Sequence, residues 1–196
     1  GVTLPKKVMA HGMIISGGKK MSKTIGNVVD PEELIEEYGA EALRYYFARE
    51  ISPFEDGDIG KEKFQEAYNA NLANGLGNLV ARIMKMAEDN LDEAVLLERI
   101  DIPKEFVEMF DNLEIQKASD IVWREITKLD EYIQTTKPFS MMKENPEEAK
   151  KIISELVQRL YKISVLLTPF LPETAEKIQD AIRKNKKPEA LFLRKS

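Results

Sequence analysis

The fold of this 196-residue chain is decided by the stretch KEKFQEAYNANLANGLGNLVARIMKMAEDN, which runs from Lys61 to Asn90. Large apolar side chains recur along it at spacings of three and four residues, at Leu72, Leu76, Leu79, Ile83 and Met86. That spacing places them on one face of an α-helix. The stretch therefore predicts one long amphipathic helix whose apolar face must be covered by other helices.

A polar stripe lies beside this apolar face. Asn71, Asn78, Arg82 and Lys85 fall about 80 to 140° to one side of it at roughly 100° per residue. The stripe has no carboxylate before Asp89. Side chains at positions i and i+4 lie side by side, and amide and guanidinium groups can both hydrogen-bond the edges of unstacked bases. The stripe is therefore either a nucleic-acid contact or an ordinary solvated face.

Start and stop signals mark further helices. Asp30-Pro31 begins one helix and Gly39 ends it. Amphipathic periodicity predicts others over residues 40–50, 103–112, 115–133, 145–167 and 175–182. The expected fold class is mainly α: an antiparallel α-helix bundle preceded by a small strand, loop and helix region. The run at 51–60, dense in Pro, Gly and Asp, predicts two domains, 1–59 and 60–196.

The small N-terminal region contains a cationic loop, HGMIISGGKKMSKTIGN, at residues 11–27. The apolar segment 7–15 predicts a strand or hairpin that ends at the Gly-Gly pair. A phosphate loop of the G-x-x-x-x-G-K-[ST] kind is excluded, because the Gly, Lys and hydroxyl residues are out of register. Lys19, Lys20 and Lys23 all precede Asp30, the first carboxylate of the chain. Such a loop suits an anion that binds and leaves, although many Gly/Lys-rich loops are only solvated turns.

Composition excludes several kinds of protein. The chain has no cysteine and one histidine, which rules out a disulfide and a thiolate metal site and argues against a histidine-based one, so we predict no metal site. The net charge of −5 argues against nonspecific coating of nucleic acid. With no long apolar run and no signal-peptide pattern, we expect a soluble, cytoplasmic protein without membrane contact. The basic segment 183–196 is typical of a solubilising tail.

Two aromatic side chains are candidate stacking platforms. Trp123 is next to the core position Val122 within a predicted helix, so we expect it to pack in the core. Phe139 follows Pro138 at a helix end, where a ring can be exposed. An exposed ring there could stack on a base for about 1–3 kcal/mol. It could equally cap the core of the bundle.

The run KMSKT at residues 20–24 resembles the KMSKS signature loop of class I aminoacyl-tRNA synthetases, with Thr24 in place of the last Ser. Its surroundings, HGMIISGGKKMSKTIGNVVDPEELIEEYGAEALRYYFAREISPFEDGDI and then YNANLANGLGNLVARI, are similar to the methionyl-tRNA synthetase family in particular. The run EALR at 41–44 stands where related synthetases often have DALR. The resemblance covers nearly the whole chain and is weakest between residues 91 and 114.

This resemblance implies roles for the loop. Lys20 and Lys23 would be catalytic: they would bind the phosphates of ATP, which arrives with Mg²⁺ as its counterion, and stabilise charge as methionine attacks the α-phosphate. Met21, Ser22 and Thr24 would complete the ATP-binding loop. The residues alone suggest that the loop binds some anion. The resemblance implies that this anion is the triphosphate of ATP.

The same resemblance implies a tRNA contact. The family's Asn-x-x-x-Arg pattern matches Asn78 and Arg82, and its aromatic residue after Pro, usually Trp, matches Phe139. All three would contact the CAU anticodon of tRNA(Met). Phe139 would still stack, but it lacks the indole N–H and some ring area.

The resemblance identifies the chain as the C-terminal part of an aminoacyl-tRNA ligase that attaches methionine to tRNA(Met) using ATP. We expect this part to need an N-terminal catalytic half with a HIGH-type motif, and to be inactive and to bind no cofactor without it. Two alternatives remain. One is another class I synthetase, for Cys, Leu, Ile or Val, and the other is a non-catalytic RNA- or protein-binding helical module.

Overall fold

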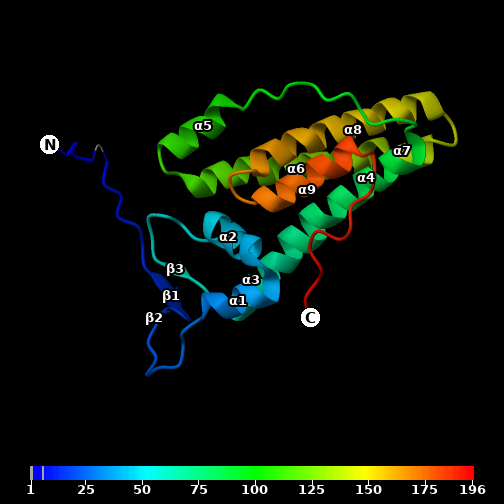
Figure 1. The fold of residues 1–196 in the computed structure, drawn as a ribbon. Coiled ribbons are helices and arrows are strands. Elements are labelled where there is room, and N and C mark those ends of the chain that lie inside the picture. Colours follow the sequence, from blue (N-terminus) through cyan, green and yellow to red (C-terminus); the bar gives the residue numbers. More distant parts are fainter. Residues whose placement is uncertain (1, 6) are drawn as a thin grey trace.

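Three short strands and the helices α1 and α2 precede a bundle of further helices in the computed structural model, which describes residues 2–5 and 7–196 (Figure 1). The strands are β1 (Ile14–Ser16), β2 (Lys19–Lys20) and β3 (Gly57–Asp58). The helices are α1 (Pro31–Tyr38), α2 (Ala40–Arg49), α3 (Lys61–Ala67), η1 (Tyr68–Gly77), α4 (Asn78–Asn90), α5 (Lys104–Asp111), α6 (Ile115–Thr136), α7 (Pro138–Met141), α8 (Pro146–Leu167) and α9 (Pro172–Arg183). The expected mainly α fold is confirmed.

Local capping signals set several helix ends where they were predicted. The side chain of Asp30 accepts a hydrogen bond from the backbone N–H of Glu32 (2.9 Å) at the start of α1. Gly39 ends that helix with φ of 88°, a conformation that favours glycine. The side chain of Asn145 caps α8 by accepting from the N–H of Glu148 (3.3 Å). These contacts span at most three residues, which is why sequence alone predicts them.

The stretch from Lys61 to Asn90 forms one continuous rod of α3, η1 and α4 (Figure 1). Its five predicted core residues are all buried. The middle of the rod, Tyr68–Gly77, is however a π-helix, in which i→i+5 hydrogen bonds widen each turn. Residues on either side of it are therefore rotated relative to a regular α-helix. Asn71 lines a polar cavity with Tyr46 and Asp58, whereas Asn78 lines a different one, so these two amides of the predicted stripe do not share one site.

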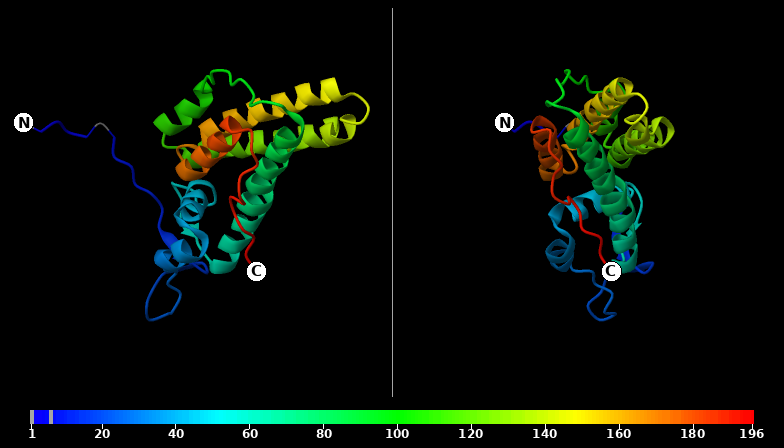
Figure 2. Two further views of the ribbon diagram at one scale, coloured as in Figure 1. Left: turned by 45° about the vertical axis from the view of Figure 1, so that its right-hand side comes forward. Right: turned by 90° about the vertical axis from the view of Figure 1, so that its right-hand side faces the viewer.

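The bundle is built around α8, which packs against α4, α6 and α9 (Figures 1 and 2). Ile153, Leu156 and Leu160 of α8 are fully buried in this contact. Each such side chain contributes about 1.5–3 kcal/mol to folding. Across residues 2–5 and 7–196, none of the helices has the length and apolar character needed to cross a membrane.

A small sheet holds the cationic loop at the edge of the molecule. β1 pairs antiparallel with β2 and parallel with β3. The turn between β1 and β2 is Gly17-Gly18, with φ of 63° and 71°. Two positive φ values are what a tight hairpin turn of the type I′ geometry requires, so glycine suits both positions. The predicted hairpin is present, although its first strand covers only the last residues of the apolar segment.

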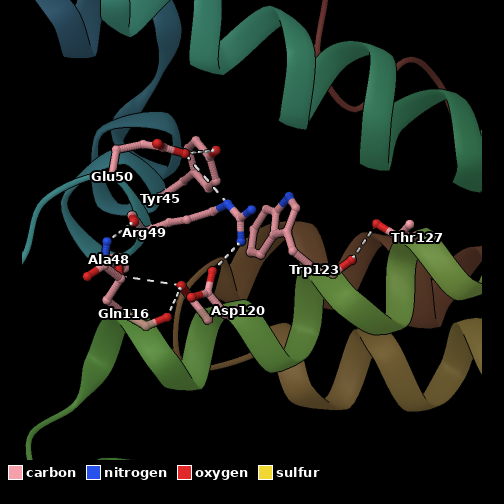
Figure 3. A network of polar contacts seen from close by, with 9 residues as sticks. Tyr45, Ala48, Arg49, Glu50, Gln116, Asp120, Trp123 and Thr127 are labelled. Atoms are coloured by element: carbon pink, nitrogen blue, oxygen red, sulfur yellow. Dashed lines mark hydrogen bonds and ion pairs between the residues drawn. The ribbon is translucent and has the colours of Figure 1, made fainter.

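A polar network fixes α2 to α6 (Figure 3). The guanidinium of Arg49 lies 5.0 Å from the centre of the Trp123 ring and pairs with Asp120 (2.9 Å). The side-chain amide of Gln116 donates to the backbone carbonyl of Arg49 (2.8 Å). The Trp123 ring also packs against Tyr45, with ring centres 4.9 Å apart, and Trp123 is only 6% exposed. The prediction that Trp123 packs in the core is confirmed. The division of the chain into two domains, 1–59 and 60–196, stays a prediction.

The end of the chain lies along the rod instead of projecting into solvent (Figure 2). The Tyr68 hydroxyl donates to the carbonyl of Leu193 (3.0 Å). The side-chain amide of Asn69 both accepts from the backbone N–H of Lys195 (2.9 Å) and donates to its carbonyl (2.8 Å). Phe192 also packs edge-on against Tyr68. The expectation of a merely solubilising tail is therefore wrong for these residues, because the π-helix supplies specific partners for their backbone.

Candidate functional site

The cationic loop is closed at its base by Asn27. The amide nitrogen of Asn27 donates to the carbonyls of Ser16 (3.0 Å) and Lys20 (3.3 Å), and its oxygen accepts from the N–H of Ser22 (2.9 Å). One side chain thus joins the end of β1, the end of β2 and the start of the loop. Sequence reasoning missed this residue; the only signal was a side-chain amide next to Gly26.

The loop itself is a turn that presents its lysines to solvent. The carbonyl of Ser22 accepts from the backbone N–H groups of Ile25 (3.2 Å) and Gly26 (3.1 Å), and Gly26 has φ of 72°. Lys20 and Lys23 are exposed. Within residues 2–5 and 7–196, neither lysine forms an ion pair. Their positive charge is therefore available to an external anion.

One carboxylate, Asp58 on β3, lies beside the hairpin, and it is already engaged. It accepts from the N–H of Gly18 (3.4 Å) and pairs with Lys63 of α3 (2.9 Å). The hydrogen bond from Lys63 holds the pKa of Asp58 below its ordinary value. Asp58 thus anchors the hairpin to the rod and is not a partner for the loop lysines.

The second candidate site is a groove of about 610 Å³ at the far end of the rod. We call it the α4 groove. Asn78, Arg82 and Lys85 of α4 line it together with Phe139 of α7 and Lys187 from the turn after α9. The structure therefore brings together all three predicted anticodon-contacting residues, although Phe139 is far from the other two in sequence. Lys187 was not predicted.

Phe139 is presented by the turn between α6 and α7. Lys137 adopts a left-handed conformation (φ 46°, ψ 52°) that ends α6, and Pro138 begins α7 and is buried. This sharp reversal leaves the next side chain pointing outward, and Phe139 is 62% exposed. The ring is thus presented at a helix end, where it can be contacted from solvent, and does not cap the core.

Arg82 is held by a carboxylate that sequence reasoning missed. Its guanidinium pairs with Asp130 of α6. Asp130 is 48 residues away in the chain, so no periodicity of the rod reveals it. A guanidinium has five N–H donors, so the pairing aims Arg82 and leaves other donors for a ligand. Its Nε atom is buried and has no hydrogen-bond partner in the described part of the chain.

Lys85 is also paired, with Asp89 one turn later (2.6 Å). That hydrogen bond raises the pKa of Lys85. Two of the three cations that line the α4 groove, Arg82 and Lys85, therefore have acidic partners, whereas the third, Lys187, forms no ion pair within the described part of the chain. The paired side chains can discriminate by hydrogen bonding, and the charge of Lys187 remains available to an anion.

The EALR run fixes the loop-bearing region onto the bundle. The carboxylate of Glu41 accepts from the backbone N–H groups of Glu173 (2.7 Å) and Thr174 (3.0 Å) at the start of α9. The guanidinium of Arg44 donates to the carbonyls of Pro169 (2.9 Å) and Phe170 (3.1 Å). Both ends of this short motif therefore clamp the turn between α8 and α9.

Two protein-family models match the chain. The model described as tRNA synthetases class I (M) matches residues 1–84. The model described as the anticodon binding domain of methionyl tRNA ligase matches residues 84–191. Together they cover the cationic loop, the α4 groove and the EALR run, whose Glu41 and Arg44 bind the turn between α8 and α9.

Curated relatives and solved structures agree with the family models. The methionine–tRNA ligase of Clostridium acetobutylicum is 38% identical over 90% of this chain, and that of Caldanaerobacter subterraneus subsp. tengcongensis is 34% identical over 91%. The chain spans 30% of the length of each. The Mycobacterium tuberculosis methionyl-tRNA synthetase in complex with methionyl-adenylate matches with a TM-score of 0.75 and 28% identity, covering 91% of this chain and 38% of that one.

Proposed function

Because this chain belongs to the methionyl-tRNA synthetase family of class I, we propose that it acts within an enzyme that attaches methionine to tRNA(Met) using ATP. In this proposal the α4 groove recognises the CAU anticodon and the cationic loop contacts ATP. The observation that carries it is the meeting of Asn78, Arg82 and Phe139 in one groove. Membership of this family also removes the support for a synthetase specific for Cys, Leu, Ile or Val.

Each of the three groove residues suits one part of an unstacked base. The amide of Asn78 offers both a donor and an acceptor to a base edge, and the guanidinium of Arg82 offers donors in a fixed plane. Phe139 offers an exposed ring face, on which a base can stack. The ion pair with Asp130 restricts the Arg82 side chain before RNA binds, so less side-chain entropy is lost on binding.

The loop suits the phosphates of ATP. Lys20 and Lys23 carry unpaired charge, and Met21, Ser22 and Thr24 complete the turn that presents it. As a carboxylate oxygen of methionine bonds to the α-phosphorus, the bond from that phosphorus to the bridging oxygen breaks and pyrophosphate leaves. Lysines beside the departing phosphates stabilise that charge most in the transition state. Mg²⁺ enters this scheme only as the counterion of ATP.

Further partners follow from the family. We propose that a nucleotide-binding half completes the amino-acid and ATP sites, since the curated relatives are much longer than this chain. On this view the chain alone binds no ATP measurably and forms no methionyl-adenylate, and the assembled enzyme works in the cytoplasm. ATP–pyrophosphate exchange by the two parts together, with Lys23→Ala as the variant, tests the catalytic assignment.

The anticodon assignment can be tested with this chain alone. The affinity for a fluorescent RNA stem-loop carrying CAU would be measured by anisotropy for wild type, Asn78→Ala and Arg82→Ala. Loss of one good base contact costs about 1–3 kcal/mol, so each variant should bind roughly 5- to 150-fold more weakly. Asn74→Ala and Arg124→Ala are the matched controls, because both side chains are exposed and lie outside the groove.

The controls should bind as wild type does. Unchanged affinity in both groove variants would contradict the anticodon assignment. A wild-type chain that binds every anticodon equally would favour the remaining alternative, a non-catalytic RNA-binding module.

A further inference from the structure

The turn after α9 is the most basic short segment of the chain. Residues 183–187 read RKNKK, four cations in five residues with no acid. Lys186 and Lys187 are both exposed, and neither forms an ion pair within the described ranges 2–5 and 7–196. Lys184 pairs with Asp180 of its own helix (2.6 Å). Arg183, Lys186 and Lys187 therefore remain without a carboxylate partner in the described ranges, and the function proposed above does not use them.

This turn is fastened to the rod by Asn185. Its backbone is left-handed, with φ of 45°, and its side-chain amide donates to the carbonyls of Leu91 (3.0 Å) and Ala87 (3.5 Å) at the end of α4. The N–H of Lys186 donates to the carbonyl of Ala181 (3.0 Å), which closes the turn. Two hydrogen bonds from Asn185 thus hold the turn beside the end of α4, and the two lysines do not lie on a free tail.

The position of the turn connects two cavities. Lys187 lines the α4 groove beside Phe139. It also lines a neighbouring cavity of about 360 Å³, which Lys184, Lys186 and Glu189 share. The acids that face these cavities are Asp89, which pairs with Lys85, Asp180, which pairs with Lys184, and Glu189. The charged side chains that line the two cavities therefore carry a net positive charge, to which the unpaired Lys186 and Lys187 contribute.

We propose that Lys186 and Lys187 bind the ribose-phosphate backbone of the RNA whose bases enter the α4 groove. This inference rests on the proposed function and adds a second kind of contact to it. Bases read by Asn78 and Arg82 remain covalently joined to phosphates that must run along a rim of the groove. Lys187 forms part of that rim, and backbone contacts supply most of the salt-dependent affinity of such complexes.

Salt dependence separates these contacts from base reading. Binding of the CAU stem-loop, and of the same stem with a scrambled loop, would be measured from low to high NaCl for wild type, Lys187→Ala, Lys187→Arg and the double variant Lys186→Ala/Lys187→Ala. Each lost phosphate contact should reduce the slope of log K against log salt by about 0.7–0.9. The double variant should therefore bind roughly tenfold or more weakly at ~0.1 M salt, and equally so for both RNAs.

The control is Lys104→Ala on α5, at the opposite end of the bundle (Figures 1 and 2). It should leave the slope unchanged, and Lys187→Arg should retain the wild-type slope because the charge is retained. A double variant with the slope of wild type overturns the proposal, as does a wild-type chain that binds neither RNA. Failure of the proposed function looks different: wild type then shows no preference for CAU, while the double variant still loses slope.

Discussion

The carboxylate of Glu41 caps the helix that begins beside Thr174, more than a hundred residues later in the chain. It accepts hydrogen bonds from the Thr174 backbone N–H (3.0 Å) and hydroxyl (2.5 Å). The residue at the usual capping position of α9 is Leu171, which makes no side-chain hydrogen bond. Glu41 therefore takes the place of a local N-cap residue for α9, and the same contact joins the loop-bearing region to the bundle.

Removing this cap should destabilise the whole chain. Glu41→Ala leaves the first N–H groups of α9 without their acceptor and removes a negative charge from a helix N-terminus. We expect the free energy of unfolding to fall by about 1–3 kcal/mol. Urea unfolding followed by circular dichroism measures it, with the exposed Glu36→Ala as the control. Equal midpoints for the two variants would mean that the contact contributes nothing to stability.

Removing Asn27 should loosen the loop without unfolding the bundle. Asn27→Ala deletes three hydrogen bonds that join the two strands to the loop. At about 1 kcal/mol each, their loss should speed amide hydrogen exchange of residues 16–26 by at least roughly tenfold. Exchange in α8 should not change. Lys19→Ala, which removes an exposed side chain from the same hairpin, should leave the loop protected as in wild type.

The ring of Phe139 should govern RNA affinity and have little influence on stability. Phe139→Ala removes a mostly exposed ring, so the unfolding midpoint should barely move. Affinity for the CAU stem-loop should fall by about 1–3 kcal/mol if a base stacks on it. Phe139→Trp should bind more tightly than wild type because the ring is larger. A Phe139→Ala variant with wild-type affinity would remove stacking from the proposal.

The network between α2 and α6 should depend more on Arg49 than on Asp120. Arg49→Ala loses both the stack on Trp123 and the ion pair, whereas Asp120→Ala loses only the pair, and the Asp120 side chain is 54% exposed. Exposed pairs contribute about 0.2–1 kcal/mol, and a partly desolvated cation–π contact adds about 0.5–2 kcal/mol. The free energies of unfolding of the two single variants and the double variant give the coupling energy between Arg49 and Asp120. A larger loss of stability in Asp120→Ala than in Arg49→Ala would contradict this ranking.

Sequence predicted those features whose cause is local. Asp30 and Asn145 cap helices through backbone groups two or three residues away, and Gly39 ends a helix through its own conformation. The apolar face of the rod was found because burial selects apolar residues at the helical spacing. Phe139 was expected at a helix end because it follows a proline, and the left-handed Lys137 places it there.

Sequence alone also determined the family and named the three residues that meet in the groove. The family motif and the helical periodicity both pointed to Asn78 and Arg82, and the motif alone pointed to Phe139. Only the tertiary structure decided which side chains support them. Asn71 lies in the π-helix and lines another cavity, Asp130 reaches Arg82 from α6, and Asn185 holds the turn before Lys187 at the end of α4. Such contacts join residues that are distant in the chain, and their geometry exists only after the helices have packed. A periodic pattern carries no information about that packing.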